Sequence, residues 1–348
     1  MTSDEPWLSG FVELVAGRLR AVAPVARITI GRGDGVKTLA TVGRVCERAV
    51  ECGATRATVL VAIGGGNVGN ITGLCAALLF RGIRLIQVPT TLLAMSDVVL
   101  SLKQGVNITG VRNGLGTYYA PELIWADPRT LETLPAAEIQ GGQAEIIKNA
   151  LILAPGQIPV LLKLFRPGGG YLPGELTAMI DLAISAKSAV LRDDAKERNA
   201  ALVLEYGHTV GHALEVLAGG TLSHGFGVAL GMRVAARVAR RLGMLDDAHV
   251  DLHDQLLSAA GLPLGLPETL APRAGELAGQ LCRDNKRGYL RLDPSQIPMV
   301  LLSAPGVPAL TDGIPLTGVD ADLVLAEFQA AFSPRGAGAR LADAPGAW

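Results

Sequence analysis

The feature that most restricts the fold is an apolar stretch, ATVLVAI at residues 57–63, which glycines follow directly. A strand that is apolar on both faces is typical of a parallel sheet, because helices cover both faces of such a sheet. A similar stretch, RLIQVP, follows at 84–89, and an apolar helix from about 71 to 80 is expected between the two. The sequence therefore predicts a β-α-β unit whose ligands bind at the carboxyl ends of the strands.

The residues before this unit extend the same alternation of helix and strand. Apolar residues at helical spacing over 11–22 precede a β-branched strand at 25–30, and a second helix is expected over 38–50. The 348 residues suit two domains better than one. We therefore predict an α/β fold whose first domain, over residues 1–136, is a doubly wound, Rossmann-like nucleotide-binding domain.

From about Leu131 onward the periodicity of the apolar residues becomes that of helices. We predict an all-helical metal-binding domain over residues 137–333 and a loose tail over 334–348, which is rich in Gly, Ala and Pro. The amphipathic helices expected in this domain are 142–153, 174–192, 206–218, 225–242 and 248–260.

Charge and hydropathy exclude several classes of partner. The net charge of -1 gives no general attraction for nucleic acid or for an anionic membrane, so an anionic ligand must be bound locally. No apolar stretch approaches the roughly 20 residues that span a bilayer, and the start MTSDEPW lacks a signal-peptide pattern. The four cysteines form no C-x-x-C pair and are interpreted as reduced thiols. We expect a cytoplasmic protein with a small-molecule substrate and without nucleic-acid or membrane partners.

Three of the five histidines fall within 17 positions. His208 and His212 are four residues apart and would share one face of a helix, and His224 follows 16 residues after His208. Glu145 in AEIIKN is a candidate carboxylate partner. One carboxylate with two imidazoles is the ligand set of a catalytic zinc-type site that keeps a position open for substrate. The alternative interpretation is that these histidines are ordinary surface or core residues.

The glycine-rich segment GGGNVGN at 64–70 follows the apolar strand and begins a helix. Glycines in this position let main-chain amides approach a pyrophosphate at the helix N-terminus. The pattern is not G-x-G-x-x-G, and the same glycines could serve helix–strand packing alone. Both interpretations remain open on this segment by itself.

The order of the motifs resembles one enzyme family. GGGNVGN is followed by PTTLLAMSD, SLKQGVN, RNGLGTYYAP, GGQAEIIKN, EYGHTVGHALE, SHG and RDNKRG. Over about residues 30–305 this series resembles the 3-dehydroquinate synthase superfamily of sugar phosphate cyclases. The resemblance implies a homodimeric lyase that uses NAD and a divalent metal to eliminate phosphate and close a carbocycle.

The resemblance also assigns the cofactor site. Asp34 and Lys37 of GDGVK correspond to an acidic residue and a lysine near the adenosine, and Asp4 corresponds to an aspartate that binds the ribose. The chain is expected to lack the first strands of the family. The residues implied to bind NAD are Asp4, Asp34, Lys37, Gly66, Asn67, Val68, Gly69, Asn70, Thr90, Thr91, Lys103, Arg112 and Asn113.

The same resemblance assigns the metal ligands. They are Glu145, His208 and His224, with zinc or cobalt as the metal, whereas His212 stays free as a catalytic or substrate contact. The family usually has an acidic residue after the HG of this motif, where this chain has Phe226. A missing carboxylate behind a ligand histidine would loosen its orientation and weaken metal binding.

Several charged residues match positions of the family that handle substrate. Lys103 and Lys148 are implied to be catalytic, together with Glu205 and His212. The implied substrate-binding residues are Asp97, Asn113, Lys286 and Arg81, and Arg81 corresponds to an arginine that reaches the phosphate bound by a neighbouring subunit.

Two positions distinguish substrates within the superfamily. Dehydroquinate synthases carry an arginine seven residues before the first motif histidine and an asparagine three before it, whereas this chain has Ala201 and Glu205. The arginine would pair with a substrate carboxylate. SLKQ, LEYGH and GNITGLCAALLFRG resemble instead the 2-deoxy-scyllo-inosose synthases of aminocyclitol antibiotic biosynthesis, whose substrate is glucose 6-phosphate. Glu205 is then a general base or proton relay, or alternatively a carboxylate favoured at a helix start.

Other functions remain open at this point. A dehydroquinate or valiolone-type cyclase uses the same machinery, and a metal-dependent alcohol or glycerol dehydrogenase shares the fold but consumes NAD. A degenerate paralogue that keeps the fold and binds cofactor poorly is the non-enzymatic alternative.

Overall fold

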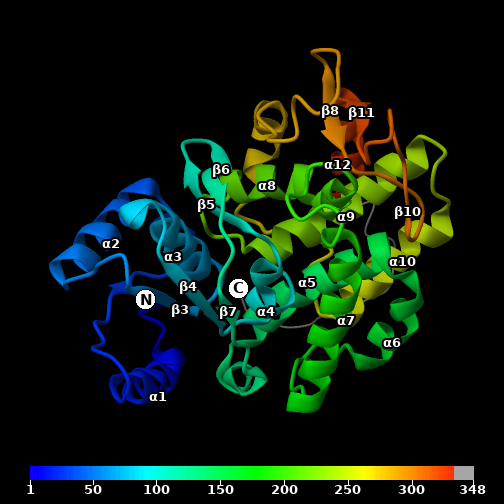
Figure 1. The fold of residues 1–348 in the computed structure, drawn as a ribbon. Coiled ribbons are helices and arrows are strands. Elements are labelled where there is room, and N and C mark those ends of the chain that lie inside the picture. The colour runs from blue at the N-terminus through cyan, green and yellow to red at the C-terminus, as the bar shows by residue number, and fades with distance from the viewer. Residues whose placement is uncertain (333–348) are drawn as a thin grey trace.

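The computed structural model describes residues 1–332, apart from the side chains of residues 271, 272 and 274, and the tail expected over 334–348 lies outside this range. Figure 1 shows an α/β part formed by the N-terminal third of the chain and a mainly helical part formed by the remainder. The predicted fold class is therefore confirmed.

The α/β part is built on one parallel sheet of five strands. The strand order is β2-β1-β3-β4-β7. As predicted, β3 (Val59–Gly64) and β4 (Arg84–Pro89) are parallel neighbours, and they pair along their whole length. β7 (Leu123–Ile124) lies at one edge. Of the strand predicted over 25–30, only β2 (Thr29–Ile30) forms, because its neighbour in the sheet is a strand of two residues.

The start of the chain contributes this two-residue strand. Residues Thr2–Ser3 form β1, which lies between β2 and β3. The amide of Thr2 donates to the carbonyl of Ile28, and the amide of Asp4 donates to the carbonyl of Ile30. Residues 2–3 thus add a strand to the sheet that the sequence analysis did not predict. Two residues are too few to produce a periodic pattern that the sequence could show.

Helices cover both faces of the sheet, which explains why its central strands are apolar. α1 (Ser9–Arg20) packs on the face that carries Ile63. α2 (Leu39–Glu51) and α3 (Gly66–Leu78) pack on the opposite face, around Ala62. Because α3 follows β3 directly, its N-terminus lies at the carboxyl edge of the sheet.

An antiparallel hairpin stands between the two parts of the molecule (Figure 1). It consists of β5 (Lys103–Ile108) and β6 (Val111–Tyr118). The sequence analysis did not predict it, because its glycines are rare in strands. One of them is needed for the pairing itself: a Cβ at Gly116 would lie 2.3 Å from the main-chain oxygen of Gln104.

The helical part is organised around α9, which packs against α5, α8, α10 and α12. None of the helices within residues 1–332 is long and apolar enough to cross a membrane. The helices of this part are α5 (Ala136–Leu153), α6 (Ile158–Leu164), α7 (Pro173–Leu191), α8 (His208–Leu217), α9 (His224–Arg241), α10 (Asp247–Ala259), α11 (Leu277–Leu281) and α12 (Ala321–Phe332).

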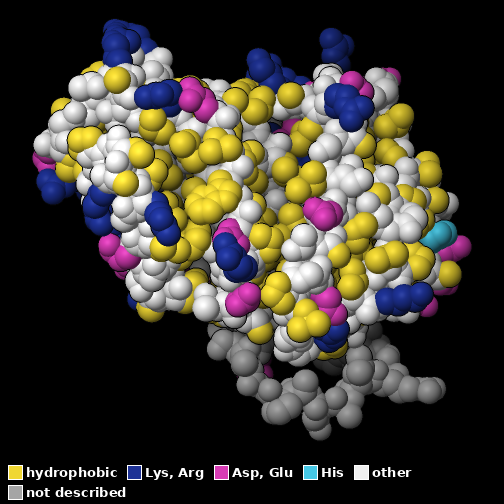
Figure 2. Space-filling view, turned by 60° about the horizontal axis from the view of Figure 1, so that its bottom comes forward, with side chains coloured by type: hydrophobic (Ala, Val, Ile, Leu, Met, Phe, Trp, Pro, Cys, Tyr) yellow, Lys and Arg dark blue, Asp and Glu magenta, His cyan; other side chains and the backbone are white. Residues whose placement is uncertain are grey.

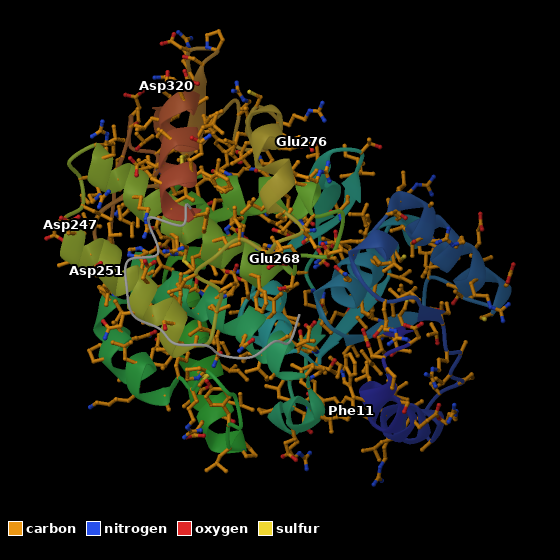
Figure 3. The ribbon with its side chains drawn as sticks, turned by 180° about the vertical axis from the view of Figure 1, so that it is seen from behind. Phe11, Asp247, Asp251, Glu268, Glu276 and Asp320 are labelled. Carbon is orange, nitrogen blue, oxygen red and sulfur yellow. The ribbon has the colours of Figure 1, made fainter. Side chains whose placement is uncertain are left out.

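The predicted all-helical character needs one correction. β8 (Gln296–Met299) pairs with β11 (Thr317–Asp320), and β9 (Leu302–Ala304) pairs with β10 (Val307–Pro308). Strands of two to four residues are too short to show an alternating pattern, so the sequence did not reveal them. Figure 3 shows the molecule from behind, with Phe11 at the end formed by α1 and Asp320 near the opposite end.

Candidate active site

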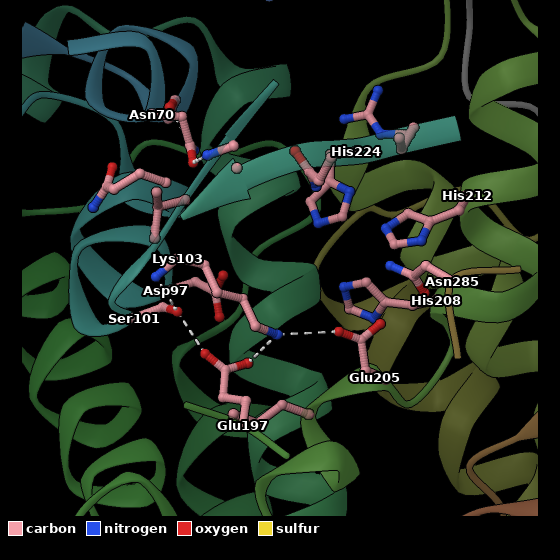
Figure 4. Close-up of a pocket in the computed structure, with 18 of the residues that line it drawn as sticks. Asn70, Asp97, Ser101, Lys103, Glu197, Glu205, His208, His212, His224 and Asn285 are labelled. Atoms are coloured by element: carbon pink, nitrogen blue, oxygen red, sulfur yellow. Dashed lines mark hydrogen bonds and ion pairs between the residues drawn. The ribbon is translucent and has the colours of Figure 1, made fainter. Parts of the chain in front are cut away.

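A cleft of about 470 Å³ lies between the two parts, lined from α3, the hairpin, α5, α8 and α9. Figure 4 shows the histidines entering it from one side and the acidic and basic side chains facing them. The predicted site residues on its wall are Lys37, Gly66, Asn67, Asn70, Asp97, Lys103, Arg112, Asn113, Lys148, Glu205, His208, His212, His224 and Lys286.

The three clustered histidines meet in this cleft. Ring nitrogens of His208, His212 and His224 lie within 4.8 Å of one another. The Glu145 carboxylate lies behind them, with Oε1 at 3.6 Å from Nε2 of His208 and 3.5 Å from Nε2 of His224. Glu145 is fully buried, and among the described residues no hydrogen bond is directed at either of its oxygens, although the ammonium of Lys148 lies beside Oε2. A buried carboxylate that faces two imidazoles without hydrogen bonds suits a bound cation.

Close contacts between helices bring these side chains together. α8 begins at His208 and α9 begins at His224, so both histidines lie on a first turn. A Cβ at Gly225 would lie 2.1 Å from the main-chain oxygen of Gly141 in α5, and a Cβ at Gly211 would lie 2.9 Å from that of Gly227. Glycine at these positions therefore allows the close approach on which the cluster depends.

The three histidines differ in pKa because their electrostatic environments differ. Burial lowers the pKa of His208 well below its ordinary value and lowers the pKa of His212 to about 3. Burial also opposes protonation of His224, but the carboxylates of Glu215 and Glu145 outweigh it and raise the pKa of His224 to about 9. Neutral imidazoles are the form that binds metal, so His208 and His212 are already in that form at neutral pH.

Glu215 is a site residue that the sequence analysis missed. Its Oε1 lies 3.0 Å from Nδ1 of His224, which leaves Nε2 of this histidine directed at Glu145. Glu215 thus supplies the carboxylate that Phe226 cannot, and the expectation of a loosely held His224 is wrong. The signal was present in GHTVGHALE, because Glu215 follows His212 by three residues and therefore lies on the same helix face.

The glycine-rich segment forms the first turn of α3, with Gly65 at the N-cap and no acidic side chain in that turn. A helix N-terminus of this kind binds anions through its free main-chain amides. The Asn67 side-chain amide donates to the carbonyl of Gly33, and the Asn70 side-chain oxygen accepts from the amide of Gly105. These two bonds hold the turn against the neighbouring loop and hairpin.

Other residues predicted to bind the cofactor lie behind this wall. Val68 and Thr90 are buried, and Thr91 packs behind Gly65, where an added Cβ would lie 3.1 Å from Cγ2 of Thr91. A Cβ at Gly69 would lie 2.8 Å from Oε1 of Gln87, so this glycine serves helix–strand packing. The packing interpretation therefore holds for Gly69, and pyrophosphate binding by this segment stays a prediction.

Asp4 and Asp34 lie near the carboxyl edge of the sheet rather than on the cleft wall. Asp4 follows β1 and pairs with Arg32 at 3.4 Å. Asp34 accepts from Asn107 at 2.8 Å and pairs with Arg112 at 2.6 Å. Both contacts tie the segment around residue 34 to the hairpin.

Four charged side chains of the cleft lie close to one another, namely Lys103, Glu197, Glu205 and Lys286. Lys103 donates to Glu197 at 2.7 Å and lies 3.5 Å from Glu205 (Figure 4). The other carboxylate oxygen of Glu205 lies 3.9 Å from the ammonium of Lys286. Burial opposes ionisation of Glu205, but Lys103 and Lys286 outweigh it and lower the pKa of Glu205 to about 2. Burial likewise disfavours the charged form of Lys103, yet Glu205 and Glu197 raise its pKa.

Glu197 was not predicted. It lies in an irregular segment with a φ of 53°, a conformation that side chains other than glycine rarely adopt. It also accepts a hydrogen bond from the Ser101 hydroxyl. A single glutamate in KERN has no periodic or motif signal, so only the structure identifies it.

Lys187 of α7 was also missed. It donates to Asp97 at 2.7 Å, and burial, which would raise the pKa of Asp97, is outweighed by Lys187 and Lys148, so that the pKa lies well below its usual range. Arg81, by contrast, lies outside the cleft on the exposed turn Leu79–Arg81, where it has a φ of 68°.

The residues present fit both groups that the resemblance implies. The Glu145 carboxylate, opposite two Nε2 atoms and without directed hydrogen bonds, fits a divalent metal. The first turn of α3 and the buried Lys37, which line the same cleft, fit the phosphates of a dinucleotide.

Comparison with known proteins identifies the family. The 3-dehydroquinate synthase N-terminal model matches residues 27–141, and the 3-dehydroquinate synthase C-terminal model matches residues 142–287. The chain therefore belongs to the 3-dehydroquinate synthase family.

The similar curated proteins define the branch of this family. The chain is 44% identical over 336 residues to the 2-deoxy-scyllo-inosose synthase of Streptomyces paromomycinus, covering 96% of this chain and 86% of that protein. It is 47% identical over 307 residues to that of Streptomyces ribosidificus, covering 88% and 78%. A crystal structure of a 2-deoxy-scyllo-inosose synthase complexed with carbaglucose-6-phosphate, NAD+ and Co2+ superposes with a TM-score of 0.86 at 38% identity, covering 94% of this chain and 89% of that one. Within the family, the chain belongs with the 2-deoxy-scyllo-inosose synthases.

Proposed function

We propose that this protein is a lyase that converts D-glucose 6-phosphate to 2-deoxy-scyllo-inosose and inorganic phosphate. The observation that carries this proposal is the position of Glu205 between Lys103 and Lys286, in the same cleft as Glu145 and the histidine cluster. Ala201 is fully buried and provides no cation for a substrate carboxylate, and the Glu205 carboxylate would repel one. The site therefore favours a sugar phosphate without a carboxylate over the carboxylate-bearing sugar phosphate of a dehydroquinate synthase.

Two groups would complete the site. Glu145, His208 and His224 would hold a divalent metal, zinc or cobalt, and the first turn of α3 would hold NAD, together with the residues predicted above. The related crystal structure that contains NAD+ and Co2+ supports both assignments. When bound, NAD accepts and later returns a hydride, and the metal lowers the pKa of the hydroxyl that is oxidised.

Side chains of the cleft would bind the substrate and transfer its protons. Lys103, Lys148 and Lys286 provide cations for hydroxyl and phosphate oxygens, and Asp97 and Asn113 orient the substrate. Glu205 is proposed as the base that takes a carbon-bound proton during phosphate elimination, with His212 beside it as a second catalytic contact. Because Lys103 and Lys286 hold the pKa of Glu205 at about 2 before substrate binds, a phosphate that draws these lysines away would make Glu205 a stronger base.

We further propose a homodimer. β7 is an edge strand, and its apolar residues Leu123 and Ile124 are 53% and 40% exposed. An exposed apolar edge strand is a surface that can pair with another chain. Figure 2 shows hydrophobic side chains gathered in the middle of one face of the molecule. Arg81, on an exposed turn, is available to reach a second subunit, as the family resemblance implies. Light scattering on the purified protein tests this assembly.

The proposed reaction also implies a cellular compartment and a pathway. Glucose 6-phosphate and NAD are cytoplasmic metabolites, and 2-deoxy-scyllo-inosose is the carbocycle of the aminocyclitol antibiotics. We therefore propose a cytoplasmic enzyme of aminocyclitol antibiotic biosynthesis.

The test is incubation with glucose 6-phosphate, NAD+ and Co2+ or Zn2+. The proposal predicts one phosphate released for each 2-deoxy-scyllo-inosose formed, with no net NADH, because the hydride returns to the product. Stoichiometric NADH would indicate a dehydrogenase of the same fold. Absence of both phosphate release and NAD+ binding would indicate a degenerate paralogue.

A further inference from the structure

The carboxylate of Glu215 joins the histidine cluster to the hairpin. It is almost completely buried in α8, and its two oxygens face in different directions. Oε1 lies 3.0 Å from Nδ1 of His224, and Oε2 lies 3.0 Å from Nε of Arg112 in β6. The contact with Arg112 is an ion pair at low exposure, and its alignment is not that of a hydrogen bond. One buried carboxylate thus connects α9 with β6.

Arg112 carries the connection into the α/β part. Its Nη1 lies 2.6 Å from Oδ2 of Asp34, which also accepts a hydrogen bond from Asn107 at 2.8 Å. Asp34 begins the segment Asp34–Val36, and the residue before it, Gly33, accepts a hydrogen bond from the side chain of Asn67. The row of contacts therefore runs from His224 to the first turn of α3.

Arginine is suited to this position in a way that lysine is not. Its guanidinium presents separate N–H groups in a rigid plane, so that Nε meets Glu215 while Nη1 meets Asp34. A lysine ammonium is a point charge on a flexible chain and holds two carboxylates with no fixed angle between them.

We propose that Glu215 and Arg112 are positioning residues that couple metal binding at His224 to cofactor binding at the first turn of α3. This inference rests on the proposed function, because it requires that both ligands bind. A metal that fixes His224 also fixes Glu215, and through it the orientation of Arg112 and of the segment at Asp34. Because coupling between two sites is reciprocal, NAD raises the affinity for metal by the same factor as metal raises the affinity for NAD.

The experiment measures both affinities on the metal-free full-length protein. Co2+ binding is followed by its visible absorption, with and without saturating NAD+, and NAD+ binding is followed by calorimetry, with and without Co2+. In the wild type we expect each ligand to strengthen the other about fivefold or more. No turnover is required for either measurement.

Two variants and one control separate the contributions. Glu215→Gln removes the charge behind His224, and we expect the Co2+ affinity to fall by roughly 10–100-fold, with an altered Co2+ spectrum. Arg112→Lys keeps Glu215 in place, so Co2+ alone should bind nearly as in the wild type while the coupling factor falls toward one. Arg237→Lys changes an arginine of similar exposure that pairs with Asp254 away from the cleft, and it should keep the wild-type coupling.

Each remaining outcome has one meaning. Full coupling in Arg112→Lys, or an unchanged Co2+ affinity in Glu215→Gln, overturns the inference. A wild type that binds both ligands without coupling also overturns it and leaves the proposed function intact. A wild type that binds neither ligand overturns the proposed function itself. If circular dichroism shows that Glu215→Gln is unfolded, the coupling factor measured in Arg112→Lys still tests the inference.

Discussion

Glu205 is held by Lys103 and Lys286, and its role depends on its charge. Replacing Glu205 with glutamine keeps the shape and removes the base. We expect phosphate release from glucose 6-phosphate to fall by about 10²–10⁴-fold in kcat, the usual contribution of a general base. The control is Glu175→Gln, which changes a half-buried glutamate that pairs with Arg166 outside the cleft. Full turnover by the Glu205→Gln enzyme would show that the carboxylate only begins the adjacent helix.

Glu197 acts on the same lysine from the other side. Glu197→Gln removes the negative charge that accepts a hydrogen bond from Lys103, a bond worth about 1.5–3 kcal/mol. If that energy is lost from the transition state, kcat should fall about tenfold or more. Burial disfavours the charged form of Lys103, and its two carboxylates raise its pKa, so losing one carboxylate lowers that pKa again. The basic limb of the kcat–pH profile should therefore move to lower pH. An unchanged basic limb would contradict a role through Lys103.

At the scale of elements, the packing of α8 on α9 sets the distance between the histidines. In Gly211→Ala, the added methyl would lie 2.9 Å from the main-chain oxygen of Gly227, so the helices must move apart. We expect a loss of about 1–3 kcal/mol in the free energy of unfolding and a weaker affinity for Co2+. Gly43→Ala, in the middle of α2 with no atom within 4 Å of the added Cβ, is the matched control and should not be destabilising. Urea unfolding measures both, and equal stabilities would contradict the packing argument.

The contact between α10 and the start of α8 makes stability depend on pH. His253 is fully buried, and its Nδ1 donates to the carbonyl of His249 at 2.7 Å, so its Nε2 accepts from the Tyr206 hydroxyl at 2.8 Å. Burial lowers the pKa of His253 from 6.5 to about 4. Between pH 6.5 and 4 the unfolded chain therefore binds a proton that the folded one does not. The stability that the neutral ring provides is present above pH 6.5 and is lost at up to roughly 1.4 kcal/mol per pH unit as the pH falls to 4.

The variant His253→Gln tests this slope. Urea unfolding at pH 7.5 and at pH 5 should show a smaller difference in the variant than in the wild type, because the titrating group is gone. An equal difference in the two proteins would assign the acid sensitivity to other groups.

The same scale shows what the sequence could reveal. Central strands and long helices were predicted because burial on one or two faces produces a period that a single sequence displays, as at 84–89 and 174–192. The hairpin was missed because its pairing requires glycines such as Gly116, which weaken the strand signal. Glu197 and Lys187 were missed because each is an isolated charge whose partner is distant in the sequence. Glu215 was missed although its spacing of three residues from His212 placed it on the same helix face.

At the scale of the whole molecule, the metal site joins distant parts of the chain. Glu145 and His208 are 63 residues apart, and His208 and His224 are 16 apart, so the unfolded chain offers no assembled site. Co2+ at 100 times its Kd should then add about 2.7 kcal/mol to the free energy of unfolding. Thermal unfolding with Co2+ and with a chelator measures the gain. In Glu145→Gln the gain should disappear, and its persistence would place the metal elsewhere.

The short turn Ala200–Glu205 carries the two positions that we propose distinguish substrates, whereas the histidine cluster, the glycine-rich turn and the hairpin lie on other elements. Changes at the other five residues of this turn would then alter which sugar phosphate is accepted while Glu205 and the groups that perform the oxidation stay in place. Divergence of substrate within such a family requires few mutations. A designed exchange of this turn between relatives is a direct route to a new carbocycle.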